Sequence, residues 1–139
     1  MPLSGPIVII EDDNDDQEIL REVFNQLNLP NVLHFFSSPT EAFCYLLNTT
    51  EKPFLIISDI NMPILNGFEL KEEINQTECL RRKNIPFVFL STNSENRTIA
   101  KAYDLLVQGY FIKPTKISDL REMLLAMIHY WKTSAPPFH

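Results

Sequence analysis

The sequence has no apolar run that approaches the roughly 18 consecutive residues needed to cross a membrane. Its first residues, MPLSGP, lack the basic start and the long apolar stretch of a secretory signal. The two cysteines, Cys44 and Cys79, are not spaced as a CxxC motif. We therefore expect a cytoplasmic protein without a membrane anchor. Two reduced thiols fit that compartment best, with a disulfide or a shared metal as the alternatives.

Basic residues are scarce, since 12 Lys and Arg stand against 18 Asp and Glu and the formal net charge is −6. Such a surface repels the phosphates of nucleic acids, and no basic stripe offsets it. The one basic cluster, Arg81-Arg82-Lys83, falls in a predicted connection between a helix and a strand. A solvated loop accounts for it, so we expect no direct binding to nucleic acid.

The overall composition is that of a globular protein, with 45% hydrophobic and 22% charged residues in a chain of 139. Neither an internal repeat nor a low-complexity segment is visible. We expect one domain over residues 1–139, with its core at about 7–132. A short tail over 133–139 would follow, without an output domain.

Five short apolar runs are predicted strands, and the first, third and fourth are almost continuously apolar, as in strands buried on both faces. The runs lie at residues 7–10, 32–36, 54–58, 87–90 and 110–112. Apolar residues at helical spacing follow each of them. These stripes lie at residues 19–27, 42–47, 67–74, 99–107 and 120–131.

Two local signals mark helix ends. Ser38-Pro39-Thr40-Glu41 is typical of a capping box with proline at the first helical position. Gly109 follows the fourth stripe, where we expect a left-handed cap. Because strand and helix alternate five times, the sequence predicts an α/β fold with a doubly wound parallel sheet.

Polar side chains follow four of the predicted strands at their carboxyl ends, where ligands bind in such sheets. They are Glu11, Asp12 and Asp13; Asp59 and Asn61; Ser91, Thr92 and Asn93; and Lys113. Clustered carboxylates repel one another unless a cation joins them, and oxygen ligands suit Mg²⁺ or Mn²⁺. With a hydroxyl and an ammonium group nearby, this set predicts phosphoryl transfer onto a carboxylate, and Asp59 lies between the others.

At these residues the chain resembles the receiver domain of two-component response regulators, over about residues 7–131. Within that family it is most similar to stand-alone receivers associated with bacterial phytochrome kinases, through YDLLVQGYFIKP and the tryptophan ending the last helix. The residues that carry the family resemblance are Glu11-Asp12, Asp59 with Asn61-Met62-Pro63 and Gly67, Ser91, and Tyr110 leading to Lys113-Pro114.

The resemblance implies a flavodoxin-like (βα)5 fold with strand order 2-1-3-4-5. It implies that Asp59 accepts a phosphoryl group from a phosphohistidine of a sensor kinase, with Mg²⁺ or Mn²⁺ bound. Asp12 would be a direct metal ligand, Glu11 would act partly through water, and Asn61 would offer its backbone carbonyl. Asp13 competes for these positions, although a solvated place before the first helix fits it better. Asp15 and Asp16 are expected only to favour that helix's positive end.

The resemblance also implies a switch, in which Ser91 bonds the phosphoryl group and Tyr110 turns into the space that Ser91 leaves. The bond between Lys113 and Pro114 is expected to be cis. Thr92 departs from the family, in which a small residue commonly follows the switch hydroxyl. Together with Asn61 and Asn93 it would narrow the approach to the phosphate and alter autodephosphorylation.

We expect a signalling protein that is not an enzyme. The only reactions that it would catalyse are its own phosphorylation and dephosphorylation. Its partners would be a sensor kinase such as a bacterial phytochrome, or a phosphotransfer protein, and a downstream protein target. A homodimer would form through the fourth helix, fifth strand and fifth helix. The alternative is a receiver-fold interaction module that works without phosphorylation. A flavin site is disfavoured because the acidic loop after the first strand would repel a flavin phosphate. An aspartyl-phosphate hydrolase is disfavoured as well, because such enzymes often have a second aspartate as general acid two residues after the nucleophile, where this chain has Asn61.

Overall fold

The computed structural model describes residues 5–62 and 66–135. Its five strands form one parallel sheet in the order β2-β1-β3-β4-β5, which confirms the predicted topology. The strands are β1 (Ile7–Ile10), β2 (Leu33–Phe36), β3 (Leu55–Ser58), β4 (Phe87–Ser91) and β5 (Gly109–Ile112). The helices are α1 (Asn14–Leu27), α2 (Pro39–Asn48), α3 (Gly67–Gln76), α4 (Glu78–Arg81), α5 (Asn96–Asp104) and α6 (Ile117–Thr133).

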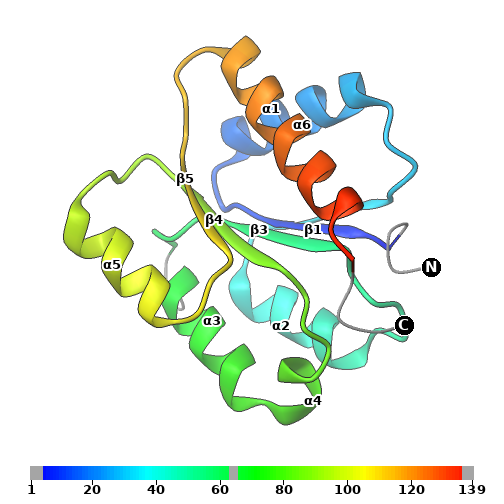
Figure 1. Ribbon diagram of the computed structural model, residues 1–139, viewed down its shortest axis with the longest axis vertical. Helices are drawn as coiled ribbons and strands as arrows, with labels where there is room; N and C mark the ends of the chain where they lie inside the picture. Colours follow the sequence, from blue (N-terminus) through cyan, green and yellow to red (C-terminus); the bar gives the residue numbers. More distant parts are fainter. Residues whose placement is uncertain (1–4, 63–65, 136–139) are drawn as a thin grey trace.

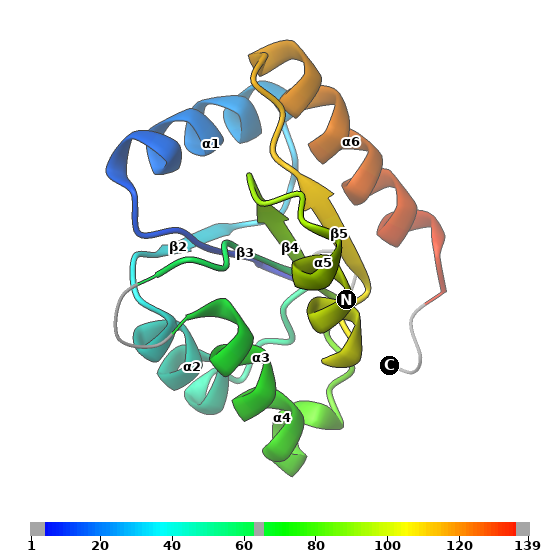
Figure 2. The same cartoon turned by 90° about the vertical axis from the view of Figure 1, so that its left-hand side faces the viewer.

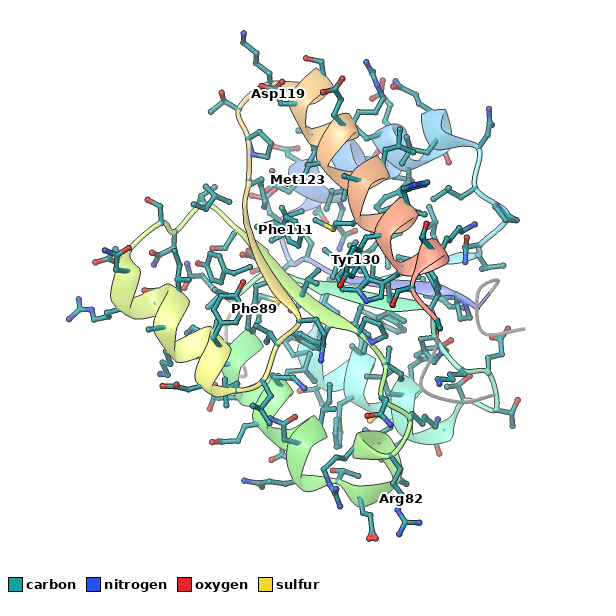
Figure 3. The ribbon with its side chains drawn as sticks, viewed as in Figure 1. Arg82, Phe89, Phe111, Asp119, Met123 and Tyr130 are labelled. Atoms are coloured by element: carbon teal, nitrogen blue, oxygen red, sulfur yellow. The ribbon has the colours of Figure 1, made fainter. Side chains whose placement is uncertain are left out.

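Helices cover both faces of the sheet, with α1 and α6 on one side and α2, α3 and α5 on the other (Figures 1 and 2). Side chains alternate along β1, so that Ile7 and Ile9 join the core under α1 and α6 while Val8 and Ile10 join the opposite core. Figure 3 shows Phe111 and Met123 together between β5 and α6. The short helix α4 was not predicted. The fourth and fifth helices of the sequence prediction therefore correspond to α5 and α6 of the structure.

The prediction for the end of α5 was wrong. The helix ends at Asp104, and Leu106 takes the left-handed conformation with φ 66°, whereas Gly109 has no positive φ and begins β5. The apolar spacing continued past the helix because Val107, which follows the end of α5, is buried in the core. Leu106 is 70% exposed, so its apolar side chain did not mark a buried helical position.

The prediction for the start of α2 is confirmed in part. The helix begins at Pro39 as expected, and the hydroxyl of Ser38 accepts a hydrogen bond from the backbone N–H of Glu41, which is one of the two bonds of a capping box. Cys44 and Cys79 are exposed free thiols. None of the helices in the described part of the chain is long and apolar enough to cross a membrane.

Candidate functional site

The predicted site residues come together at the carboxyl edge of the sheet. Hydrogen bonds between strands continue past the strand ends, since the backbone N–H of Asp59 donates to Ile10 O at 3.0 Å and that of Lys113 donates to Ser91 O at 2.8 Å. These bonds hold residues from four neighbouring strands at one level. The sheet therefore gathers side chains that are far apart in the sequence.

Three carboxylates form the acidic part of this edge. Glu11, Asp12 and Asp59 each offer an oxygen, and these oxygens all lie within 4.8 Å of one another. Glu11 is only 2% exposed, and the other two are half-buried. Three oxygen donors at this separation repel one another but suit a hard divalent cation such as Mg²⁺ or Mn²⁺. The donor set therefore fits the metal that the sequence predicts.

The electrostatics of the cluster follow from its burial. Burial raises the pKa of Glu11 to about 7, against the opposing effect of the Lys113 charge, and the charge of Asp59 raises it further. Burial also raises the pKa of Asp59, although its carboxylate accepts a hydrogen bond of 2.8 Å from the N–H of Ile60 and feels the Lys113 charge. Burial therefore disfavours the ionised forms of Glu11 and Asp59 as long as no cation is bound.

Lys113 supplies the positive charge of the site. Its ammonium group lies 3.1 Å from Glu11 Oε1 and 3.2 Å from Asp16 Oδ2. Burial acts to lower the pKa of Lys113, but the charges of Glu11, Asp59 and Asp16 outweigh it and the pKa is raised. Lys113 therefore remains fully charged beside the acidic cluster.

Asp16 is a site residue that sequence reasoning missed. We expected it only to favour the positive end of the first helix, yet it shares Lys113 with Glu11. The cap of α1 is Asp13, whose carboxylate accepts from the N–H groups of Asp15 and Asp16 at 2.8 and 3.2 Å. Once Asp13 is recognised as the cap, Asp16 falls in the first turn of α1, directly after the acidic loop, and this closeness to Glu11 and Asp12 was the available signal.

The two predicted switch residues meet at Asn93. Ser91 is 1% exposed, and its hydroxyl accepts a hydrogen bond of 3.1 Å from the N–H of Asn93. The hydroxyl of Tyr110 donates to the carbonyl of Asn93 at 2.6 Å, and its ring packs near Phe89. Thr92, between Ser91 and Asn93 in the sequence, is exposed. Asn93 is therefore a link between Ser91 and Tyr110, which the sequence alone did not indicate.

Gly67 fits a narrow space beside Asp59. A Cβ atom at this position would meet the carbonyl oxygen of Asp59, and it would lie 2.8 Å from the ring of Phe89. The N–H of Gly67 donates to Ile60 O at 2.9 Å, which ties the start of α3 to the segment after Asp59. Asn61 in this segment is exposed, and Pro63 lies outside the described residues.

The prediction of a cis bond before Pro114 was wrong. The bond between Lys113 and Pro114 is trans, and no peptide bond among the described residues is cis. Bonds to proline prefer trans by about 0.5–1 kcal/mol, so a proline by itself does not impose the cis form.

Comparisons with known proteins identify the family to which the chain is similar. The family profile of the response regulator receiver domain matches residues 7–125. The response regulator Rcp1 of Synechocystis sp. is 28% identical over 130 residues, which cover 90% of this chain and 87% of Rcp1. The solved structure of the phosphorylated cyanobacterial phytochrome response regulator RcpA has a TM-score of 0.85 at 28% identity, over 96% of this chain and 98% of RcpA.

The Mn²⁺-bound form of Rcp1 has a TM-score of 0.82 at 27% identity, over 96% of this chain and 99% of that one. The likeness thus extends through the fold, and the family profile spans the strand ends that carry the site. The chain belongs to the response regulator receiver domain family, and its relatives include response regulators of phytochromes.

Proposed function

We propose that this response regulator accepts a phosphoryl group on Asp59 from a phosphohistidine of a sensor kinase. The observation that carries the proposal is the meeting of a half-buried carboxylate, two further carboxylates and a charged lysine at one edge of the sheet. Members of this family are signalling proteins. We place the reaction in the cytoplasm, where the exposed thiols of Cys44 and Cys79 stay reduced.

Mg²⁺ or Mn²⁺ would be held by Glu11, Asp12 and Asp59, with the backbone carbonyl of Asn61 as a further ligand. The three carboxylates fit such an ion, and the relative Rcp1 has been solved with Mn²⁺ bound. When bound, the ion neutralises negative charge on the phosphoryl oxygens. It would also offset two effects that disfavour the ionised carboxylates, namely their burial and their mutual repulsion.

The transfer itself needs positioning more than covalent chemistry from the protein. A carboxylate oxygen of Asp59 forms a bond to phosphorus while the bond from phosphorus to the histidine nitrogen breaks, and the imidazole keeps that electron pair. Lys113 supplies a positive charge beside the acceptor. The relative RcpA has been solved in a phosphorylated form. Hydrolysis of the phosphorylated Asp59 is a separate reaction, in which water attacks phosphorus and the Asp59 carboxylate leaves, and the exposed Thr92 would slow it by narrowing the approach of water.

The signal would leave through the surface of α5, β5 and α6. Phosphorylation would draw the hydroxyl of Ser91 from the N–H of Asn93 to a phosphoryl oxygen, and Tyr110 would then exchange its bond to the Asn93 carbonyl for an inward position. Large apolar side chains are exposed on these elements, namely Tyr103, Ile112, Ile117, Leu125 and Tyr130. A downstream protein, or a second copy of the chain, would bind there.

Intact-mass spectrometry after incubation with acetyl phosphate tests the chemistry. The protein is measured with Mg²⁺, with a chelator, and as the Asp59→Asn variant. We expect one added phosphoryl group that requires both Mg²⁺ and Asp59. A folded protein that gains no phosphate under any condition would contradict the proposal and favour an interaction module that works without phosphorylation.

The dimer is tested separately by light scattering at several protein concentrations, with and without phosphodonor. A mass that rises toward twice that of the monomer on phosphorylation supports a homodimer. A constant monomer mass in both states rules it out and leaves another protein as the partner. The cognate kinase is sought first among phytochrome kinases, because RcpA is a phytochrome response regulator.

A further inference from the structure

A cavity lies at the edge of the sheet opposite to Asp59, and the proposed phosphoryl transfer does not use it. It has a volume of about 300 Å³ and is bounded by α3, α4 and the amino ends of β4 and β5. Its floor is buried and mostly apolar, whereas Arg81 and Gln108 on its rim are exposed. The apolar floor residues are Leu46, Ile56, Ile74, Leu80 and Phe87.

Lys71 is the charged residue of that floor. It lies on the inward face of α3, between Leu70 and Ile74 in the helical spacing, and is only 7% exposed. Its ammonium group donates to Asn75 Oδ1 at 2.7 Å and lies 5.6 Å from the ring centroid of Phe87. Asn75 and Phe87 also line the cavity, so the ammonium nitrogen lies among the cavity-lining groups.

No carboxylate in the described part of the chain forms an ion pair with the cations of this cavity. Over residues 5–62 and 66–135, neither Lys71 nor Arg81 has a carboxylate within the 4.0 Å of an ion pair. An ammonium group removed from water loses several kcal/mol unless an anion or several hydrogen-bond acceptors replace its hydration. Burial accordingly lowers the pKa of Lys71.

A purely structural lysine explains only part of this arrangement. Asn75 has a structural role of its own, because its Nδ2 donates to Leu105 O at 2.9 Å and so links α3 to the end of α5. That bridge needs neither a cavity beside the ammonium group nor the second cation, Arg81, on its rim. An anionic ligand accounts for the buried charge, the cavity and the rim cation together.

We propose that this cavity binds a small organic monoanion with an apolar body, such as an aromatic or branched-chain carboxylate, whose carboxylate pairs with Lys71. Its apolar body lies against the buried floor, and Arg81 attracts the anion at the rim. A volume of about 300 Å³ is at the small end of ligand pockets and suits a single ring or a branched chain with a carboxylate.

The test is an NMR titration of the ¹⁵N-labelled protein with benzoate, phenylacetate and isovalerate, and with benzamide as the neutral analogue of benzoate. We expect saturable shifts of the amide signals of Lys71, Asn75, Phe87 and Gln108 with at least one carboxylate. Benzamide should bind at least tenfold more weakly than benzoate. The absence of saturable shifts with all three carboxylates would overturn the proposal, as would equal binding of benzamide and benzoate.

Variants locate the charge that matters. Lys71→Met keeps the length of the side chain and should weaken carboxylate binding at least tenfold, whereas Lys101→Met on the exposed surface of α5 should not change it. Arg81→Gln at the exposed rim should weaken binding several-fold, and it provides a readout even where Lys71→Met fails to fold. Unchanged affinity in folded Lys71→Met, or in Arg81→Gln where Lys71→Met is unfolded, would refute the site.

This binding is independent of the chemistry at the other edge of the sheet. The Asp59→Asn variant should bind the carboxylates as the parent does, because Asp59 does not line the cavity. A protein that takes up no phosphate can therefore still confirm this site, and a protein that binds no carboxylate can still be phosphorylated.

Discussion

The ammonium nitrogen of Lys113 lies 3.1 Å from Oε1 of Glu11, although 102 residues separate the two in the sequence. The Glu11 side chain is almost completely buried, and that of Lys113 is largely so. A buried pair of this kind adds little stability by itself, but the loss of one partner leaves the other uncompensated. The pair therefore makes the fold depend on a residue that we place in the functional site.

Replacing Lys113 by alanine should destabilise the protein. We expect the free energy of unfolding to fall by about 3 kcal/mol at a pH above about 8, where Glu11 of the parent is ionised, because the buried carboxylate then loses its cation. Urea unfolding with a chelator present measures the change. Lys116→Ala, at an exposed lysine three residues on, is the matched control and should change the free energy little.

A double-variant cycle separates the pair from other effects of losing Lys113. Glu11→Gln removes the charge that Lys113 compensates, so Lys113→Ala should cost much less in the Glu11→Gln background. Equal costs in the two backgrounds would show that the ion pair is not the source of the destabilisation.

The stability of the metal-free protein should fall as the pH rises from about 5 to about 7. Glu11 has its pKa raised from 4.5 to about 7, so in this range the folded protein binds more protons than the unfolded chain. Stability due to this group is complete below pH 4.5 and is lost as the pH passes through about 7, by about 3 kcal/mol in total.

Urea unfolding at a series of pH values, with a chelator present, measures this slope. Glu11→Gln should flatten it, because the variant has no proton to lose at this position. Saturating Mg²⁺ should also reduce it, since the cation favours the ionised carboxylates. A slope that is the same in the parent and in Glu11→Gln would contradict the assignment to Glu11.

Gly67→Ala should damage the site from outside the acidic cluster. The added methyl group would meet the backbone oxygen of Asp59 and the ring of Phe89, so the start of α3 has to move. We expect a loss of about 1–3 kcal/mol in stability from this overpacking. Phosphate uptake from acetyl phosphate should slow as well, as measured by intact mass, whereas Glu72→Ala on the exposed side of α3 should leave uptake unchanged.

Thr92→Ala should shorten the life of the phosphorylated protein several-fold. Thr92 is exposed beside Ser91, and its side chain would limit the approach of water to a phosphoryl group on Asp59. The decay of the phosphorylated mass after removal of the phosphodonor measures this rate. Ser94→Ala, at an exposed residue further along the same loop, is the control, and a decay as slow as the parent's in Thr92→Ala would remove the role of Thr92.

Much of the fold was predictable because its signals are local. The continuous apolar runs of β1, β3 and β4 indicated strands buried on both faces, and these strands are completely buried. The same reasoning failed at the end of α5, because burial of Val107 after the helix imitates helical spacing. Periodicity records which residues are buried, and it does not record the backbone conformation that buries them.

The candidate site was predictable as a set of residues but not as a set of contacts. Glu11, Asp12 and Asp59 follow strands, so the parallel sheet had to gather them. Asp16 was assigned only to a helix end, because its partner Lys113 is 97 residues away. Asn93 was seen as a neighbour of the site, and its two hydrogen bonds to Ser91 and Tyr110 depend on how β4 and β5 pair.

The sequence by itself determined the alternation of strands and helices, the doubly wound sheet and the edge at which the acidic and basic residues meet. Only the tertiary structure decided that Lys113 pairs with Glu11 and Asp16, and that Lys71 lies buried beside an apolar cavity. The physical reason is that secondary structure follows from short-range spacing, whereas pairing and burial of charges depend on distances between elements. Those distances exist only once the helices have packed onto the sheet.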